Sequence, residues 1–76
     1  MVNIPVGSKP YGLHARADGV WVACYGDHTV ERIDPKAAHV VGRPIHVGLN
    51  PVGVEVSHGS LWVTSVGDNN LTRIAL

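Results

Sequence analysis

The sequence predicts an all-β fold in which one structural unit occurs twice. Apolar residues make up 45% of the chain and are mostly Val, Ile, Leu and Ala. They alternate with polar residues over short stretches, as in half-buried strands. Gly, Pro, Asp and Asn separate these stretches. We find no segment with helical apolar spacing and therefore expect short strands joined by tight turns.

The structural unit recurs with a period of 41 residues. Residues 4–35 and 45–76 align without a gap, and 11 of the 32 pairs are identical. The identical pairs include Trp21 with Trp62, both in the middle of an alternating stretch. We expect these two rings to belong to the core or to an interface between sheets, not to a sugar-stacking platform.

Each copy predicts the same strands in the same order. The expected strands are residues 12–16, 20–25, 30–33 and about 39–47 in the first copy, and 53–57, 61–66 and 71–74 in the second. Residues 17–19 and 58–60 are expected to form turns. Residues 26–29 and 67–70 are expected to form tight hairpin loops in which Gly supplies a positive φ.

Four antiparallel strands in about 40 residues are typical of a β-propeller blade. The second copy ends before a fourth strand, and residues 2–7 correspond to the end of such a strand. We therefore expect two four-stranded blades within residues 1–76. Repeat 1 covers about residues 4–44, and repeat 2 covers about 45–76 and is completed by strand 2–7 of a neighbouring chain.

Matching segments occur in both copies along nearly the whole chain. They are IPVG, KPYGL, VWVA, DH and VERIDP in the first copy, and IHVG, NPVGV, LWVT, DN and LTRI in the second. These segments resemble propeller repeats of the YVTN and streptogramin-lyase-like type, which are close to NHL repeats. The resemblance implies the blade fold. Such blades serve lyases, lactonase-like enzymes, binding proteins and scaffolds alike.

Members of this group usually close a ring within one chain, whereas two blades leave two apolar sheet faces uncovered. We therefore expect a homo-oligomer with head-to-tail cyclic symmetry. A trimer with six blades is favoured over a dimer or a tetramer, because six blades lie within the usual range and four are cramped. The alternative is a fragment of a longer propeller, or an engineered cut of one.

Composition argues against several kinds of partner. Six basic residues balance six acidic ones without runs of either sign, which argues against nucleic-acid binding. Cys24 is the single cysteine and is expected to be a buried apolar side chain. With no signal peptide or apolar span, we expect a soluble chain without a membrane partner.

Propellers usually bind ligands with the loops at one rim. We expect that rim to carry Lys9, Tyr11, His28, Asn50 and Asn69. The five His lack the spacing of a metal motif, so no metal or other cofactor is expected. A three-fold axis that joins three copies of one His is the remaining route to a metal site.

Two functions follow from these observations. The first is a non-enzymatic, oligomeric binding or scaffold module for a small polar ligand or a protein. The second is a lyase or lactonase-like enzyme with a metal-assisted site in the central channel, since the resemblance implies His and Glu around that opening. His14 and Glu55 occupy equivalent positions and are the channel candidates. The enzyme hypothesis requires one of them to point into the channel.

Overall fold

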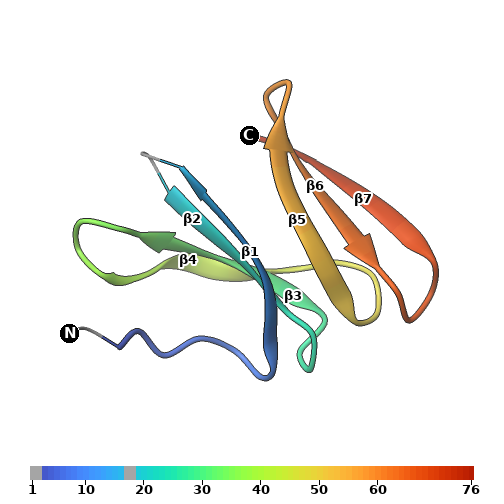
Figure 1. The fold of residues 1–76 in the computed structure, drawn as a ribbon, viewed down its shortest axis with the longest axis horizontal. Coiled ribbons are helices and arrows are strands. Elements are labelled where there is room, and N and C mark those ends of the chain that lie inside the picture. The colour runs from blue at the N-terminus through green and yellow to red at the C-terminus, as the bar shows by residue number, and fades with distance from the viewer. Residues whose placement is uncertain (1–2, 17–18) are drawn as a thin grey trace.

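The computed structural model describes residues 3–16 and 19–76, which form two antiparallel sheets (Figure 1). Sheet 1 contains β1 (Pro10–Arg16), β2 (Gly19–Cys24), β3 (Thr29–Asp34) and β4 (His39–His46), in that order. Sheet 2 contains β5 (Pro51–Ser57), β6 (Ser60–Ser65) and β7 (Asn70–Ala75). The described residues include no helix able to cross a membrane. The all-β prediction is confirmed, and the expected strand positions agree closely with the observed ones.

The two sheets share one pairing register. His14 lies opposite Trp21 in the β1–β2 ladder, and Glu55 lies opposite Trp62 in the β5–β6 ladder. Both ladders contain a register shift at the start of their first strand, before Gly12 and before Gly53. Residues 41 positions apart therefore occupy matching places in the two sheets. We refer to them below as equivalent positions.

The leading strand, residues 2–7, is predicted to pair with a neighbouring chain, and within one chain its described residues take another position. Residues 3–9, called the N-terminal segment below, form no strand, and Val2 lies outside the described residues. Ile4 and Val6 pack instead on the face of sheet 1 that carries Val22 and Cys24. Because the segment lies on a face of sheet 1 and not at an edge, it joins no hydrogen-bonded ladder within its own chain. The turn expected at residues 17–19 includes Ala17 and Asp18, which are also outside the described residues.

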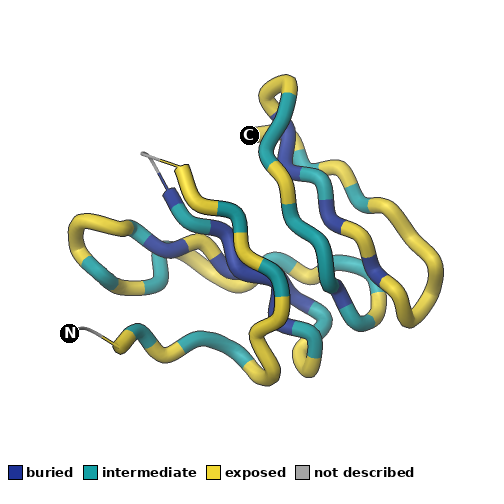
Figure 2. Tube along the Cα trace, viewed as in Figure 1, coloured by how far each residue is buried: buried dark blue, intermediate teal, exposed yellow. Residues whose placement is uncertain are grey.

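The main core lies between the sheets. Its fully buried members are Val30 of sheet 1 and Leu61 and Val63 of sheet 2, and Trp21 is only 9% exposed. The sheets meet through β5, which contacts β1 and β2. Figure 2 shows buried residues along the strands that border this junction. Trp21 is a core residue, as predicted, whereas Trp62 is only half-buried.

Gly12 allows the backbones of β1 and β5 to approach each other closely. A Cβ atom at Gly12 would overlap the carbonyl oxygen of Val52. No side-chain rotation can relieve that overlap, because the neighbouring atom belongs to the backbone. The absence of a side chain at Gly12 thus sets the distance between the sheets.

In the hairpin loops, glycine does not supply the positive φ that the sequence predicts. The positive φ angles belong to His28 (60°) and Asn69 (54°), and not to Gly26 and Gly67. Gly26 is confined by backbone as well as by a side chain, because a Cβ there would lie 3.2 Å from the carbonyl oxygen of Ser8 and 2.5 Å from its Oγ. Gly67 is equally confined by the Asn50 side chain. Asn tolerates the left-handed conformation well, and His is also enriched there.

Candidate functional site

Four connecting segments meet at one end of the molecule, the lower end in Figure 1. They are the N-terminal segment, the β2–β3 hairpin, the β4–β5 linker and the β6–β7 hairpin. The N–H of Tyr25 donates to the carbonyl of Lys9 at 2.9 Å, and the N–H of Val66 donates to the carbonyl of Asn50 at 3.1 Å. Backbone hydrogen bonds thus order these loops. We define the rim as five residues at this end: Lys9, Tyr11, Tyr25, His28 and Asn50.

His28 and Asn50 connect the two sheets at the rim. Nδ1 of His28 accepts a hydrogen bond from the N–H of Asn50 at 3.0 Å. The side-chain amide of Asn50 donates to the carbonyl of Tyr25 at 3.2 Å, and the N–H of Val47 donates to the carbonyl of His28 at 3.0 Å. With Nδ1 as the acceptor, a neutral His28 carries its proton on Nε2. The hairpin and the linker are therefore held together by three hydrogen bonds.

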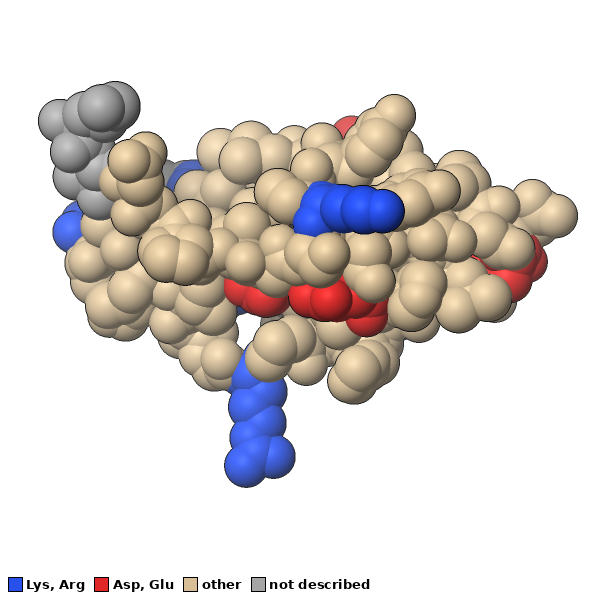
Figure 3. Space-filling view, turned by 90° about the horizontal axis from the view of Figure 1, so that it is seen from below, with Lys and Arg blue, Asp and Glu red and all other residues tan. Residues whose placement is uncertain are grey.

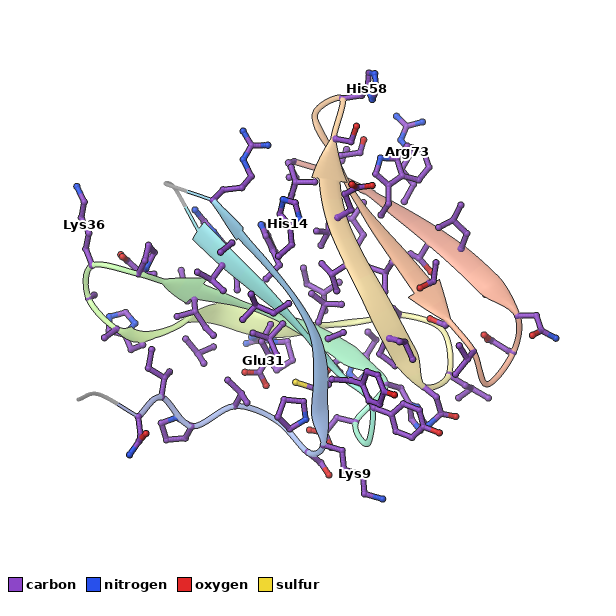
Figure 4. The ribbon with its side chains drawn as sticks, in the orientation of Figure 1. Lys9, His14, Glu31, Lys36, His58 and Arg73 are labelled. Carbon is purple, nitrogen blue, oxygen red and sulfur yellow. The ribbon has the colours of Figure 1, made fainter. Side chains whose placement is uncertain are left out.

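Two tyrosines give the rim an aromatic surface. The rings of Tyr11 and Tyr25 are tilted by 32°, with centroids 5.9 Å apart. Tyr11 is 70% exposed. Lys9 lies at the lower end of the molecule in Figure 4. Figure 3 looks onto this end from below and shows a mostly uncharged surface, with a few acidic side chains near its middle, a basic side chain lying beside them and another that projects downward in this view.

The structure brings four of the five predicted rim residues together: Lys9, Tyr11, His28 and Asn50. Asn69 lies apart from them, in the β6–β7 hairpin. Its position in sheet 2 is equivalent to that of His28 in sheet 1. Sequence reasoning missed Tyr25. Its place directly before the Gly26-Asp27 turn was the available signal, because a strand ending at a rim hairpin carries its last side chain to that rim.

The two channel candidates lie on different sheets. His14 is half-buried on the face of sheet 1 that meets sheet 2, and Figure 4 shows it between β1 and β5. Glu55 is exposed on the outer face of sheet 2, in a hollow also lined by Trp62 and Leu71. The structure therefore places the two residues at equivalent positions without bringing them together.

A separate cavity of about 430 Å³ lies at the junction, lined by residues of both sheets. Its wall includes Arg16, Arg32 and Leu76, and the Arg32 guanidinium lies 5.7 Å from the centre of the Trp21 ring. Arg73 lies over Trp62 in the same way, at 5.9 Å. The Arg–Trp contact is therefore a structural feature of each sheet. None of the five rim residues lines this cavity.

Among the residues that the structure describes, Cys24 and Asp34 have shifted pKa values. Burial raises the pKa of the Cys24 thiol, and the nearby Glu31 carboxylate adds to the shift. Hydrogen bonds from the N–H groups of Ala37 and Lys36 lower the pKa of Asp34. Neither group belongs to the rim. The described part of the chain contains no group of three or more His, Cys, Asp or Glu residues able to hold a metal ion.

A scan of protein-family models and a search of curated proteins find no match to this chain. The geometry of the chain itself therefore carries the functional interpretation.

Proposed function

We propose that the chain is a two-blade unit of a β-propeller and acts as a non-enzymatic binding or scaffold module. The supporting architecture is the pair of sheets with the same register at equivalent positions. The observation that carries the binding role is the rim, where exposed Tyr11 at the start of β1 and exposed Lys9 of the N-terminal segment lie beside the β2–β3 hairpin, which the His28–Asn50 contact holds in place. A rigid scaffold that presents variable loop residues is a common arrangement for recognition.

The chemistry of the rim favours a protein segment as the ligand. Tyr11 stands open to solvent, and its ring and that of Tyr25 offer apolar area with a hydroxyl at the end. Tyr is enriched at protein interfaces because it buries a large area and still makes hydrogen bonds. Lys9 and Asn50 add polar groups around the rings. An open surface of this kind suits an extended ligand better than an enclosed small molecule.

The position of His14 favours the binding module over the lyase-like enzyme. The enzyme hypothesis requires His14 or Glu55 to point into the central channel. His14 lies between the sheets beside Trp21, and Glu55 lies on the outer face of sheet 2. A general base needs access to its substrate, which packing between two sheets obstructs.

Selection of a phage-displayed random peptide library on the immobilised chain tests the binding role. We expect enrichment of peptides whose affinity falls at least about tenfold with Tyr11→Ser, as for an interface residue of moderate importance. The matched control is Lys36→Ser, an exposed change in the β3–β4 turn far from the rim. Failure to enrich any peptide, or equal affinity for both variants, would contradict the proposal. Circular dichroism of each variant confirms that it folds.

A further inference from the structure

Equivalent positions in the two sheets differ sharply in exposure. Val30 in β3 is fully buried, because sheet 2 covers the face of sheet 1 on which it lies. Its equivalent in β7, Leu71, is 58% exposed on the outer face of sheet 2. Val30 also pairs with Ile45 of β4, whereas β7 is the last strand of sheet 2. In sheet 1 such residues are covered by sheet 2 and paired with β4. On the outer face of sheet 2 and at the edge of β7, the equivalent residues stay uncovered in the described chain.

The position of the N-terminal segment on sheet 1 would let it cover the β7 edge of another copy. Ile4 and Val6 pack on sheet 1 beside Val20 and Val22. Their equivalents, Ile45 and Val47, pack in the same way beside Leu61 and Val63 of sheet 2. The N-terminal segment therefore has the same relation to sheet 1 that the end of β4 and the following linker have to sheet 2. Ile45 and Val47 make a further set of contacts, with β3 and the β2–β3 hairpin.

We propose that a second copy of this chain docks on β7 through its N-terminal segment, with Ile4 of one copy opposite Leu71 of the other. This proposal rests on the propeller architecture proposed above and names the partner that extends it. The internal contact between Val30 and Ile45 is its template. The new contact would continue an interface that the chain already forms within itself.

The template specifies two hydrogen bonds in the new contact. Within the chain, the N–H of Val47 donates to the carbonyl of His28, and the N–H of Asn50 donates to His28 Nδ1. The equivalent donors are Val6 and Lys9 of the second copy. The equivalent acceptors are the carbonyl and the side-chain oxygen of Asn69, whose φ of 54° is close to the 60° of His28. Asn69 thus has both the backbone conformation and the acceptor that the contact needs.

One copy cannot make this contact with itself. Its N-terminal segment and β7 lie on opposite sides of the molecule, with sheet 1 between them (Figure 1). The donor and acceptor surfaces are different, so the interface is head-to-tail and each added copy presents a new β7. A head-to-tail interface closes into a ring when the rotations between successive copies complete a full turn. Three copies would give the six blades that a propeller accommodates well.

Sedimentation equilibrium of the 76-residue chain tests the docking. We expect a stable assembly, with a mass of three chains favoured, and at least about tenfold weaker association for Leu71→Asp because the contact would bury a charge. The matched control is Leu76→Asp. Leu76 is 59% exposed, nearly as much as Leu71, and its equivalent, Pro35, lies in an exposed turn. A folded wild-type monomer at every concentration, or equal weakening by both variants, would overturn the proposal.

Asn69 provides a second comparison. Asn69→His copies the residue found at the equivalent position and keeps an acceptor, so association should change less than threefold, whereas Asn69→Gly should weaken it about tenfold. Gly keeps the positive φ, so the difference between the variants reports the side-chain hydrogen bond. Equal association of the two variants would contradict the predicted role of Asn69.

A disulfide locates the contact directly. The variant Ile4→Cys/Leu71→Cys, made with Cys24→Ser, should form bonds between chains upon oxidation, because directly opposed strand residues come within disulfide distance. Bonds within one chain, or no bonds, would overturn the proposed pairing. Peptide binding measured on the same samples separates the two proposals. Assembly without Tyr11-dependent binding would contradict the binding module alone, whereas binding by a monomer would contradict the docking alone.

Discussion

The imidazole of His28 accepts the backbone N–H of Asn50 across the junction of the two sheets, at 3.0 Å from Nδ1. The two residues are 22 positions apart in the chain, and both have positive φ angles, of 60° and 56°. The contact links the β2–β3 hairpin to the β4–β5 linker. It therefore ties the ordering of the rim to the packing of the sheets.

Replacement of His28 should measure this link. His28→Gly keeps the left-handed backbone but removes the acceptor, and we expect the free energy of unfolding to fall by about 1–2 kcal/mol. His28→Asn supplies a side-chain oxygen at the same position, as Asn69 does in sheet 2, and should recover at least half of that loss. Urea unfolding of both variants measures the difference. Equal stability of the two would show that the acceptor does not stabilise the junction.

Gly12 should tolerate substitution less well than Gly53. A Cβ at Gly12 meets the backbone of Val52, so Gly12→Ala must push the sheets apart, and we expect a loss of about 2–4 kcal/mol. A Cβ at Gly53 would lie 2.5 Å from Oγ1 of Thr64, a side chain that can rotate. Gly53→Ala should therefore cost less, and thermal unfolding of the two variants provides the comparison. A smaller loss at Gly12 would contradict the close approach of β1 and β5.

Ser65 and Cys24 are equivalent residues in buried positions, and exchanging their side chains should have opposite effects. The hydroxyl of Ser65 is buried and has no hydrogen-bond partner, which destabilises the fold. Ser65→Cys should raise the free energy of unfolding by about 1 kcal/mol, since a thiol is less costly to bury. Cys24→Ser should lower it by a similar amount. Denaturant unfolding under reducing conditions checks both, and a destabilising Ser65→Cys change would contradict the interpretation.

Asp34 should make stability depend on pH in the acidic range. Its carboxylate accepts the N–H groups of Lys36 at 2.8 Å and Ala37 at 3.2 Å, and these bonds lower its pKa from the ordinary value of 3.8. A lowered pKa means that the folded state favours the charged form. Its contribution is therefore fully present above the ordinary pKa and is lost as the pH falls through the lower, folded-state pKa.

The control for this prediction is Asp34→Asn, which keeps an oxygen acceptor for the turn but cannot titrate. We expect the free energy of unfolding of this variant to fall less steeply with acidification than that of the original chain. Unfolding curves recorded from neutral pH to about pH 2, below the ordinary carboxyl range, give the comparison. Identical slopes for the two proteins would contradict a role for Asp34 ionisation.

Local sequence patterns predicted most of the strand structure. The alternating residues expected at positions 30–33 form β3, Thr29–Asp34, and those expected at 61–66 form most of β6, Ser60–Ser65. The same loop chemistry placed Lys9, Tyr11, His28 and Asn50 at one rim. The His28–Asn50 bond could not be predicted, because it depends on how two separate sheets pack. The N-terminal segment was expected to be a strand, yet residue pattern alone does not provide the neighbouring edge that a strand requires.

The two tryptophans separate what the sequence determined from what the tertiary structure decided. The sequence alone determined that Trp21 and Trp62 lie at the same place in two similar strands, because strand alternation and turn positions are encoded locally. Only the tertiary structure decided that Trp21 is 9% exposed while Trp62 is half-buried. Burial depends on what covers a residue. Sheet 2 covers Trp21, and the described chain places no third sheet over Trp62.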